Sequence, residues 1–397
     1  MESVCKIFKI GNGPSSSHTM GPKKAAENFK AQHPDVSKFR VTLYGSLAAT
    51  GKGHLTDVAI FHALNPVETE LIWEPKTFLS YHPNAMKFEA LNSQHQAVSE
   101  KIVFSIGGGD IVTENEKPSR KPIYALSKMN EVLQWCDKEG KAIWEFVDAH
   151  EDSTTWDYLQ EVWNVMKEAV QRGIDQEGSL PGGLGLQRKA PSYFIKASGY
   201  KASLKSRSLV FSYALAVAEE NASGGIIATA PTCGSSGVLP AVLYHLATSY
   251  DFSDKKIARA LATAGLIANI VKKNASVSGA EVGCQGEIGT ACAMAAAAAS
   301  QLFGGSPAQI EYAAEMGLEH HLGLTCDPVC GLVQIPCIER NAFAAARALD
   351  ANIYSMLSDG KHRVSFDRVV MVMKQTGKDL PSLYKETSEG GLASIQG

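Results

Sequence analysis

Three of the chain's eight cysteines, Cys326, Cys330 and Cys337, occur in the single stretch LTCDPVCGLVQIPCIERN at positions 324–341. Clustered cysteines in a long chain without a secretory signal indicate metal binding or catalysis rather than disulfides. Another cysteine, Cys284, lies in GAEVGCQGEIG, where an apolar helix is predicted to begin. The positive end of a helix dipole lowers the pKa of a thiol, which favours the thiolate that binds metals. These cysteines are therefore candidate metal ligands.

The spacing of the cysteines restricts the kind of metal site. It is neither the two C-x2-C pairs of a structural zinc site nor the compact run of a ferredoxin. A scattered set of three cysteines on loop ends is compatible with a [4Fe–4S] cluster that keeps one iron open, and an open iron can act as a Lewis acid. On spacing alone, a zinc site or a chance cluster without metal stays open.

The stretch GPSSSHTMGP, near the N-terminus, places a row of polar residues between two glycine–proline pairs. Such a loop can present hydroxyl and backbone N–H groups to an anion, or it can simply cap the helix that follows. The candidate substrate-binding residues in this row are Ser15, Ser16, Ser17, His18 and Thr19.

Two histidines and one further cysteine lie in other glycine- or proline-containing turns. His54, in YGSLAATGKGHLTD, follows a predicted strand, so it is either a general base facing a cleft or a surface histidine beside a helix. His82, in YHPNAMKF, carries little information alone. Cys233, in ATAPTCGSSGVLPA, belongs either to a second anion-binding turn or to an ordinary capped helix start.

Two kinds of structure must position these residues, and we predict an α+β N-terminal domain followed by an all-α helical C-terminal domain. Residues 1–115 alternate strand-like and helix-like patterns, including the strand-like runs FRVTLYGSLA and EKIVFSIGGGD. Residues 116–150 are the predicted connector. Residues 151–397 show helical periodicity, and the segment 289–303 is apolar on all sides, which predicts a buried central helix.

The bulk composition favours an ordinary globular protein that acts on a small molecule. The chain has 397 residues, of which 45% are hydrophobic and 20% are charged. A net charge of −3 gives no electrostatic reason to expect a nucleic-acid partner. The first residues, MESVCKIFKIGNG, do not resemble a signal peptide, and the most apolar stretch is too short to span a membrane comfortably. We therefore expect a cytoplasmic protein with no membrane partner.

In these motifs, the chain resembles the iron–sulfur-dependent L-serine dehydratase family in its single-chain form. The resemblance covers nearly the whole length, through GPSSSHT, YGSLAATGKGH, SIGGG, SGAEVGCQGEIG, GLTCDPV, GLVQIPCIERN and YKETSEGGLA in that order. It implies a β domain with the SSSHT loop and a helical α domain that holds a [4Fe–4S] cluster through Cys284, Cys326 and Cys337. Cys330 and Cys233 occupy positions where relatives commonly have a small residue and Asn, so we expect them to be neighbours rather than ligands.

One departure from the family concerns the C-terminus. Some members end in a cysteine just after GGLA that folds back and occupies the open iron, whereas this chain ends GGLASIQG. We therefore expect no such self-capping, and expect the open iron to be held by water, a small molecule or Cys330.

The resemblance also implies a mechanism for converting L-serine to pyruvate and ammonia. His54 would be the base, the open iron would bind the substrate hydroxyl, and the SSSHT loop would hold the carboxylate. His82 would border the entrance. Because the base and the cluster come from different halves of the chain, the two domains would have to meet, and we expect a homo-oligomer, most simply a dimer.

Other functions remain as alternatives at this stage. One is a related [4Fe–4S] hydro-lyase acting on threonine or another hydroxy acid, and another is a non-catalytic iron–sulfur serine sensor. A pyridoxal phosphate enzyme would need a Schiff-base lysine, for which only Lys201 and Lys205 in a plain polar segment are candidates.

Overall fold

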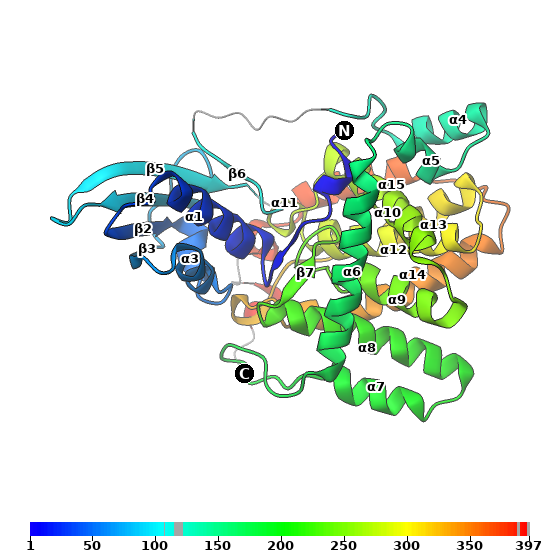
Figure 1. Ribbon diagram of the computed structural model, residues 1–397. Coiled ribbons are helices and arrows are strands. Elements are labelled where there is room, and N and C mark those ends of the chain that lie inside the picture. Colours follow the sequence, from blue (N-terminus) through cyan, green and yellow to red (C-terminus); the bar gives the residue numbers. More distant parts are fainter. Residues whose placement is uncertain (107, 115–121, 387–389, 395–397) are drawn as a thin grey trace. The chain divides into compact units, whose positions relative to one another are not determined.

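The structure is a computed structural model that describes residues 1–106, 108–114, 122–386 and 390–394. The chain divides into two compact units. The N-terminal unit is Gly11–Arg120, and the helical unit consists of Met1–Ile10 together with Lys121–Gly397. The N-terminal unit is α+β and the helical unit is mostly helices, so the predicted fold class is confirmed (Figure 1).

The N-terminal unit is built on a five-stranded sheet with the strand order β3-β2-β4-β5-β6. The parallel neighbours β2 and β3 are joined through two helices, because parallel strands need a crossover connection, whereas the remaining neighbours are antiparallel. The elements of this unit are η2 (Ser16–Met20), α1 (Gly21–Gln32), β2 (Lys38–Tyr44), α2 (Gly45–Thr50), α3 (Thr56–Leu64), β3 (Glu68–Glu74), β4 (Ala85–Leu91), β5 (Ala97–Ser105) and β6 (Ile111–Val112), and the short β1 (Ile10–Asn12) leads into it.

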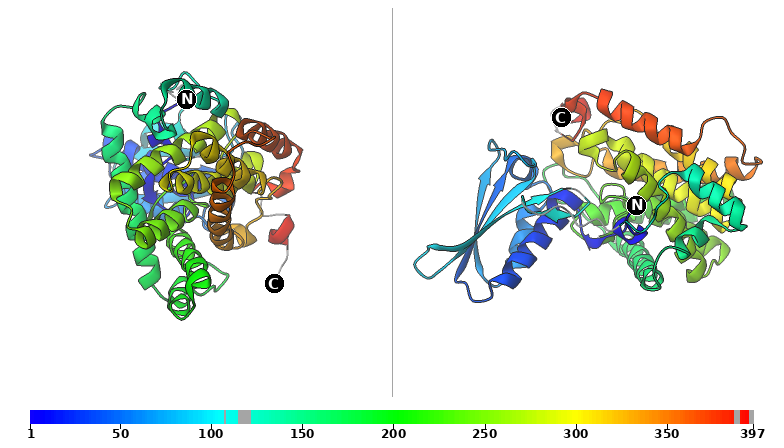
Figure 2. Two further views of the ribbon diagram at one scale, coloured as in Figure 1. Left: turned by 90° about the vertical axis from the view of Figure 1, so that its right-hand side faces the viewer. Right: turned by 90° about the horizontal axis from the view of Figure 1, so that it is seen from above.

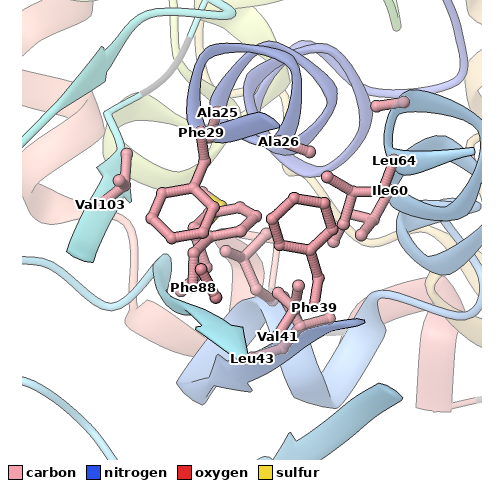
Figure 3. Packing of buried hydrophobic residues seen from close by; sticks show 14 of the residues in the cluster. Ala25, Ala26, Phe29, Phe39, Val41, Leu43, Ile60, Leu64, Phe88 and Val103 are labelled. Atoms are coloured by element: carbon pink, nitrogen blue, oxygen red, sulfur yellow. The ribbon is translucent and has the colours of Figure 1, made fainter. Parts of the chain in front are cut away.

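One face of this sheet carries the core of the N-terminal unit. Phe39, Val41 and Leu43 alternate along β2 and are fully buried, because every second side chain of a strand points to the same face. Phe29 of α1 lies against them, with its ring centroid 5.8 Å from that of Phe39 (Figure 3). Helices α1 and α3 cover this face, and Figure 2 shows the helix layer beside the sheet. The packed helices hold the loops that precede them in defined positions.

The helical unit is organised around α12 (Thr290–Leu302), which is buried along almost its whole length. Four helices pack against it, namely α9 (Val238–Tyr250), α10 (Asp254–Asn274), α13 (Pro307–Glu319) and α14 (Cys337–Met356). Its many alanines let neighbours approach closely: a Cβ placed on Gly317 of α13 would lie 2.8 Å from the Cα of Ala293. The predicted buried helix over 289–303 is thereby confirmed.

The other elements of the helical unit surround this centre. They are η1 (Val4–Lys6), α4 (Met129–Glu139), α5 (Ile143–Asp148), α6 (Thr154–Asp175), α7 (Ala190–Ser198), α8 (Ala202–Ala222), β7 (Ile226–Ala228), α9 (Val238–Tyr250), α10 (Asp254–Asn274), α11 (Gly279–Val282), η3 (Gln285–Gly289), α12 (Thr290–Leu302), α13 (Pro307–Glu319), η4 (Val329–Gly331), α14 (Cys337–Met356), α15 (Phe366–Asp379), η5 (Ser382–Tyr384) and η6 (Gly391–Ser394). In the described part of the chain, no helix combines the length and apolarity needed to cross a membrane.

Candidate active site

The SSSHT loop of the N-terminal unit forms the π-helical turn η2 with Ser15 as its N-cap, and the hydroxyls of Ser15 and Thr19 hydrogen-bond backbone groups. The Ser15 hydroxyl accepts a hydrogen bond from the backbone N–H of His18 (3.1 Å). The Thr19 hydroxyl accepts one from the N–H of Ser15 (3.1 Å) and donates to the carbonyl of His54 (2.7 Å). In the part of the chain that the structure describes, the Ser16 hydroxyl has no hydrogen-bond partner. Among the hydroxyl groups of SSSHT, that of Ser16 is therefore the least engaged in hydrogen bonds.

His18 and His54 lie against each other in the N-terminal unit, with ring centroids 4.6 Å apart. His18 makes hydrogen bonds through both ring nitrogens, Nδ1 with the Ser17 hydroxyl (2.8 Å) and Nε2 with the Ser46 hydroxyl (3.1 Å). Because both nitrogens are engaged, the ring of His18 is fixed in orientation and supports the ring of His54.

His54 has the tautomer that a general base needs. Its Nδ1 lies 3.1 Å from the carbonyl oxygen of Thr50, and since a carbonyl can only accept, Nδ1 carries the proton. The lone pair of the neutral ring is then on Nε2. Burial lowers the pKa of His54 to about 4, so the ring is neutral at pH 7. Burial and the neighbouring His54 lower the pKa of His18 well below its ordinary value.

Two residues that the sequence analysis did not select also position this histidine pair. Ser46 hydrogen-bonds His18, and the Thr56 hydroxyl donates to the carbonyl of His18 (2.6 Å). The only sequence signal for them is their place in YGSLAATGKGHLTD, beside His54.

His82, which the sequence analysis named, accepts a hydrogen bond at Nδ1 from the N–H of Asn84 (3.1 Å), and its charge contributes to lowering the pKa of His18.

The lowered pKa values of His18 and His54 predict that the N-terminal unit loses stability in acid. An unfolded histidine binds a proton below about pH 6.5, whereas folded His54 does so only near pH 4, so the unfolded state binds more protons in this window. The free energy of unfolding should therefore fall as the pH drops from 6.5 to 4, by up to about 3 kcal/mol from His54, with His18 acting in the same direction. Urea unfolding at several pH values measures this slope.

The matched comparison for this pH dependence is the His54→Gln variant, which cannot take up the proton. Its free energy of unfolding should depend less steeply on pH than that of the wild type between pH 6.5 and 4.5. Parallel curves for the two proteins would show that His54 does not contribute to acid lability.

The helical unit places Cys284, Cys326 and Cys337 at three separate chain turns. Cys284 precedes η3 and follows Gly283, Cys326 is buried in the loop after α13, and Cys337 is the first residue of α14. The three thiols influence one another electrostatically: the neighbouring Cys284 contributes to raising the pKa of both Cys326 and Cys337. The three predicted ligands therefore lie near enough to one another for their charges to interact.

The prediction that the Cys284 thiol has a lowered pKa is wrong. Burial raises the pKa of this thiol to about 12, and it raises those of Cys326 and Cys337 well above their ordinary value. Desolvation outweighs the field of a helix terminus here because the η3 turn is short and the thiols are enclosed. Thiols in such a site become thiolates when a metal supplies the compensating charge, so the donor set fits a metal group rather than a free nucleophile.

The geometry of the cysteines does not converge on a single ion. Over the ranges that the structure describes, no group of three or more His, Cys, Asp or Glu side chains could hold one metal ion. In a four-iron cluster each cysteine binds a different iron, so the sulfur atoms do not need to meet at one point. The space beside them is kept open by Gly279, where an added Cβ would lie 3.0 Å from the Cys326 sulfur.

Arg340, in the first turn of α14, ties the cysteine-bearing turns together. Its guanidinium donates to the carbonyl of Thr325 (2.7 Å) and to the Asp327 carboxylate (3.3 Å), and it also hydrogen-bonds the Cys284 thiol. A fixed positive charge favours the thiolate form, and Arg340 accordingly opposes the rise in the pKa of Cys284. Its only sequence signal is its place in the motif CIERN.

The C-terminal segment also holds the Cys326 loop. The N–H of Cys326 donates to the carbonyl of Tyr384, and the N–H of Glu386 donates to the carbonyl of Cys326, both at 2.8 Å. The N–H of Leu392 donates to Asp327 (2.9 Å). The motif GGLA thus lies beside this loop, and Ser394, where the predicted departure from the family begins, ends the short helix η6. Residues 395–397 lie outside the described residues.

The remaining two cysteines near the motifs differ from each other. Cys330 is exposed and has a left-handed backbone (φ 55°) inside η4. Cys233 is buried, and burial together with Glu287 raises its pKa.

Glu287, which the sequence analysis did not select, also raises the pKa of Cys284, Cys326 and Cys337, so its carboxylate lies near these cysteines.

Comparison with known proteins identifies the family. A family model described as serine dehydratase alpha chain matches residues 86–393, and one described as serine dehydratase beta chain matches residues 3–70. The chain is 40% identical to an L-serine dehydratase of Streptomyces coelicolor, with 98% of each chain covered. It is 39% identical to L-serine dehydratase 1 of Escherichia coli, with 99% of each chain covered. The chain belongs to the serine dehydratase family, with the alpha-chain and beta-chain regions in one polypeptide.

Proposed function

We propose that this chain is an L-serine dehydratase that uses a [4Fe–4S] cluster held by Cys284, Cys326 and Cys337. The observation that carries the proposal is that three cysteines from three separate turns lie near one another, with Cys284 and Cys326 buried and Arg340 as the counter-charge. The names of the relatives supply the substrate and the reaction class, a lyase reaction. Serine loses water to give aminoacrylate, which takes up water and releases ammonia to leave pyruvate.

The helical unit would assist the departure of the hydroxyl group. A [4Fe–4S] cluster bound by three cysteines supplies an open iron, which is a Lewis acid for the substrate hydroxyl. The protein would keep the three thiols in place through the hydrogen bonds of Arg340 and of the segment Tyr384–Glu386. It would also exclude bulk water, because Cys284 and Cys326 are buried.

The N-terminal unit would remove the Cα proton and hold the carboxylate. Nε2 of His54 carries the lone pair that accepts the proton. The hydroxyl of Ser16 in η2 is the one best placed to donate to a carboxylate, because those of Ser15 and Thr19 hydrogen-bond backbone groups and that of Ser17 hydrogen-bonds the His18 ring. A bound carboxylate would also raise the pKa of His54 from about 4 toward the working pH, because a nearby negative charge favours the protonated ring.

The structure supports a reaction that does not use pyridoxal phosphate. The two candidate Schiff-base lysines, Lys201 and Lys205, are both exposed at the start of α8. A Schiff-base lysine needs a pocket that lowers its pKa and shields the imine from water. A cytoplasmic, homo-oligomeric enzyme remains our expectation for the setting in which the reaction occurs.

The test is pyruvate formation from L-serine by protein purified without oxygen, together with its iron and acid-labile sulfide content. We expect about four iron and four sulfide ions per chain, and parallel loss of activity and iron on exposure to air. Activity that survives air and iron chelation would overturn the cluster mechanism, and zinc without sulfide would support a structural zinc site. Faster turnover of L-threonine would favour the related hydro-lyase, and serine binding without turnover would favour a sensor.

A further inference from the structure

Glu287 lies beside Cys326, one of the candidate metal ligands. It belongs to η3, three residues after Cys284, and its Oε2 lies 4.0 Å from the sulfur of Cys326. Its carboxylate accepts a hydrogen bond from the Thr232 hydroxyl. Among the residues that the structure describes, no Lys, Arg or His forms an ion pair with it. The nearby Arg340 hydrogen-bonds Thr325, Asp327 and Cys284, and its charge opposes the rise that burial causes in the pKa of Glu287. A second carboxyl group, that of Glu386, lies close enough for Glu287 to raise its pKa, so negative charge predominates around Glu287.

Two glycines leave space around this carboxylate. A Cβ placed on Gly279 would lie 2.8 Å from Oε2, and one placed on Gly234 would lie 3.7 Å from Oε1. Glu287 itself is only partly buried, unlike Gln285, Gly286 and Ile288 around it in η3. The carboxylate is therefore accessible on one side, although most of its surroundings are protein.

The negative charges around the Glu287 carboxylate favour the binding of a positively charged group there. A carboxylate removed from water is costly unless a cation or several hydrogen bonds compensate it, and thiolates at Cys326 and Cys284 would add negative charge nearby. Serine carries three polar groups. The proposed function assigns its hydroxyl to the group held by the cysteines and its carboxylate to η2, which leaves the ammonium group without a partner.

We propose that Glu287 binds the ammonium group of the amino-acid substrate and thereby selects 2-amino-3-hydroxy acids over hydroxy acids that lack the amine. This inference rests on the proposed function. An ammonium group has three donors and no acceptor, so it complements a carboxylate that accepts only. A site built around such a pair disfavours analogues without the amine, because the carboxylate, which is largely surrounded by protein, would then be left unpaired.

The test uses the Glu287→Gln variant, which keeps the size of the side chain but removes its charge, in protein reconstituted without oxygen. L-Serine and 3-hydroxypropionate are titrated as ligands, followed by the change that each causes in the visible and electron paramagnetic resonance spectra. Glu281→Gln is the matched control, because Glu281 is an exposed carboxylate six positions earlier in the same motif.

We expect Glu287→Gln to weaken L-serine binding by about 10- to 150-fold, which is the loss of one charge-assisted hydrogen-bonded pair, and to leave 3-hydroxypropionate binding within about 2-fold. Iron and sulfide content should match the wild type, and Glu281→Gln should change nothing. Glu287→Asp, which retains the charge, should retain the preference for the amine even if its affinity is lower.

Three results would overturn the inference. One is unchanged L-serine binding in Glu287→Gln, another is equal weakening of both ligands, and the third is a Glu287→Asp protein that binds both ligands equally. Loss of iron from Glu287→Gln together with normal amine preference in Glu287→Asp would still support it. A wild-type protein that neither binds nor converts L-serine would overturn the proposed function and this inference together, which separates the two kinds of failure.

Discussion

Cys337→Ser is expected to lose most of its bound iron and to lower dehydratase activity by at least about 100-fold, because even changes next to a metal ligand cost 10- to 100-fold. A serine hydroxyl is far less acidic than a thiol and does not replace a thiolate on iron. Cys337 is the first residue of α14 and neighbours both the Cys284 thiol and the Glu287 carboxylate. The helix itself should form normally, so the defect should appear in the metal content rather than in folding. Iron and sulfide analysis after anaerobic reconstitution measures it.

The control for this variant is Cys330→Ser in the same motif. Cys330 is exposed, whereas Cys284 and Cys326 are buried, so its replacement should leave iron content and activity within about 2-fold of the wild type, as most exposed substitutions do. If Cys330→Ser loses iron and Cys337→Ser retains it, the assignment of these two cysteines is reversed. Circular dichroism of both variants should show the helix content of the wild type.

His54→Gln is expected to lower kcat by about 100- to 10,000-fold with unchanged iron content, which is the usual contribution of a general base. The amide keeps a donor for the Thr50 carbonyl but has no basic nitrogen for the Cα proton. Exchange of the Cα proton of L-serine with deuterated solvent provides a second measurement, and it should fall together with kcat. Iron content separates this effect from damage at the cysteines.

The pH profile tests the same role independently. Because the free protein holds the pKa of His54 near 4, kcat/KM should decline only at strongly acidic pH. The acidic limb of kcat should lie at higher pH, since the bound carboxylate favours the protonated ring. His62→Gln is the matched control, because His62 is an exposed histidine of α3 in the same unit. Full turnover by His54→Gln would remove His54 from the mechanism and favour the sensor.

Several features follow from the sequence because they depend on local pattern. The all-apolar run over 289–303 could only be a buried helix, and it is α12. The alternation in FRVTLYG produces β2, with Phe39, Val41 and Leu43 on one face. The motifs around Cys284 and Cys326 led to the family, which the comparisons confirm.

Only the tertiary structure decides how these residues are used. Ser15 and Thr19 look equivalent to Ser16 in the motif, but their hydroxyls serve the η2 turn. Local reasoning about a helix terminus predicted a lowered pKa for Cys284, whereas burial raises it, because desolvation depends on residues far away in the chain. Glu287 and Arg340 acquire their significance in the same way. Their charges matter because folding places them beside thiols from distant turns, and no spacing in the sequence expresses that proximity.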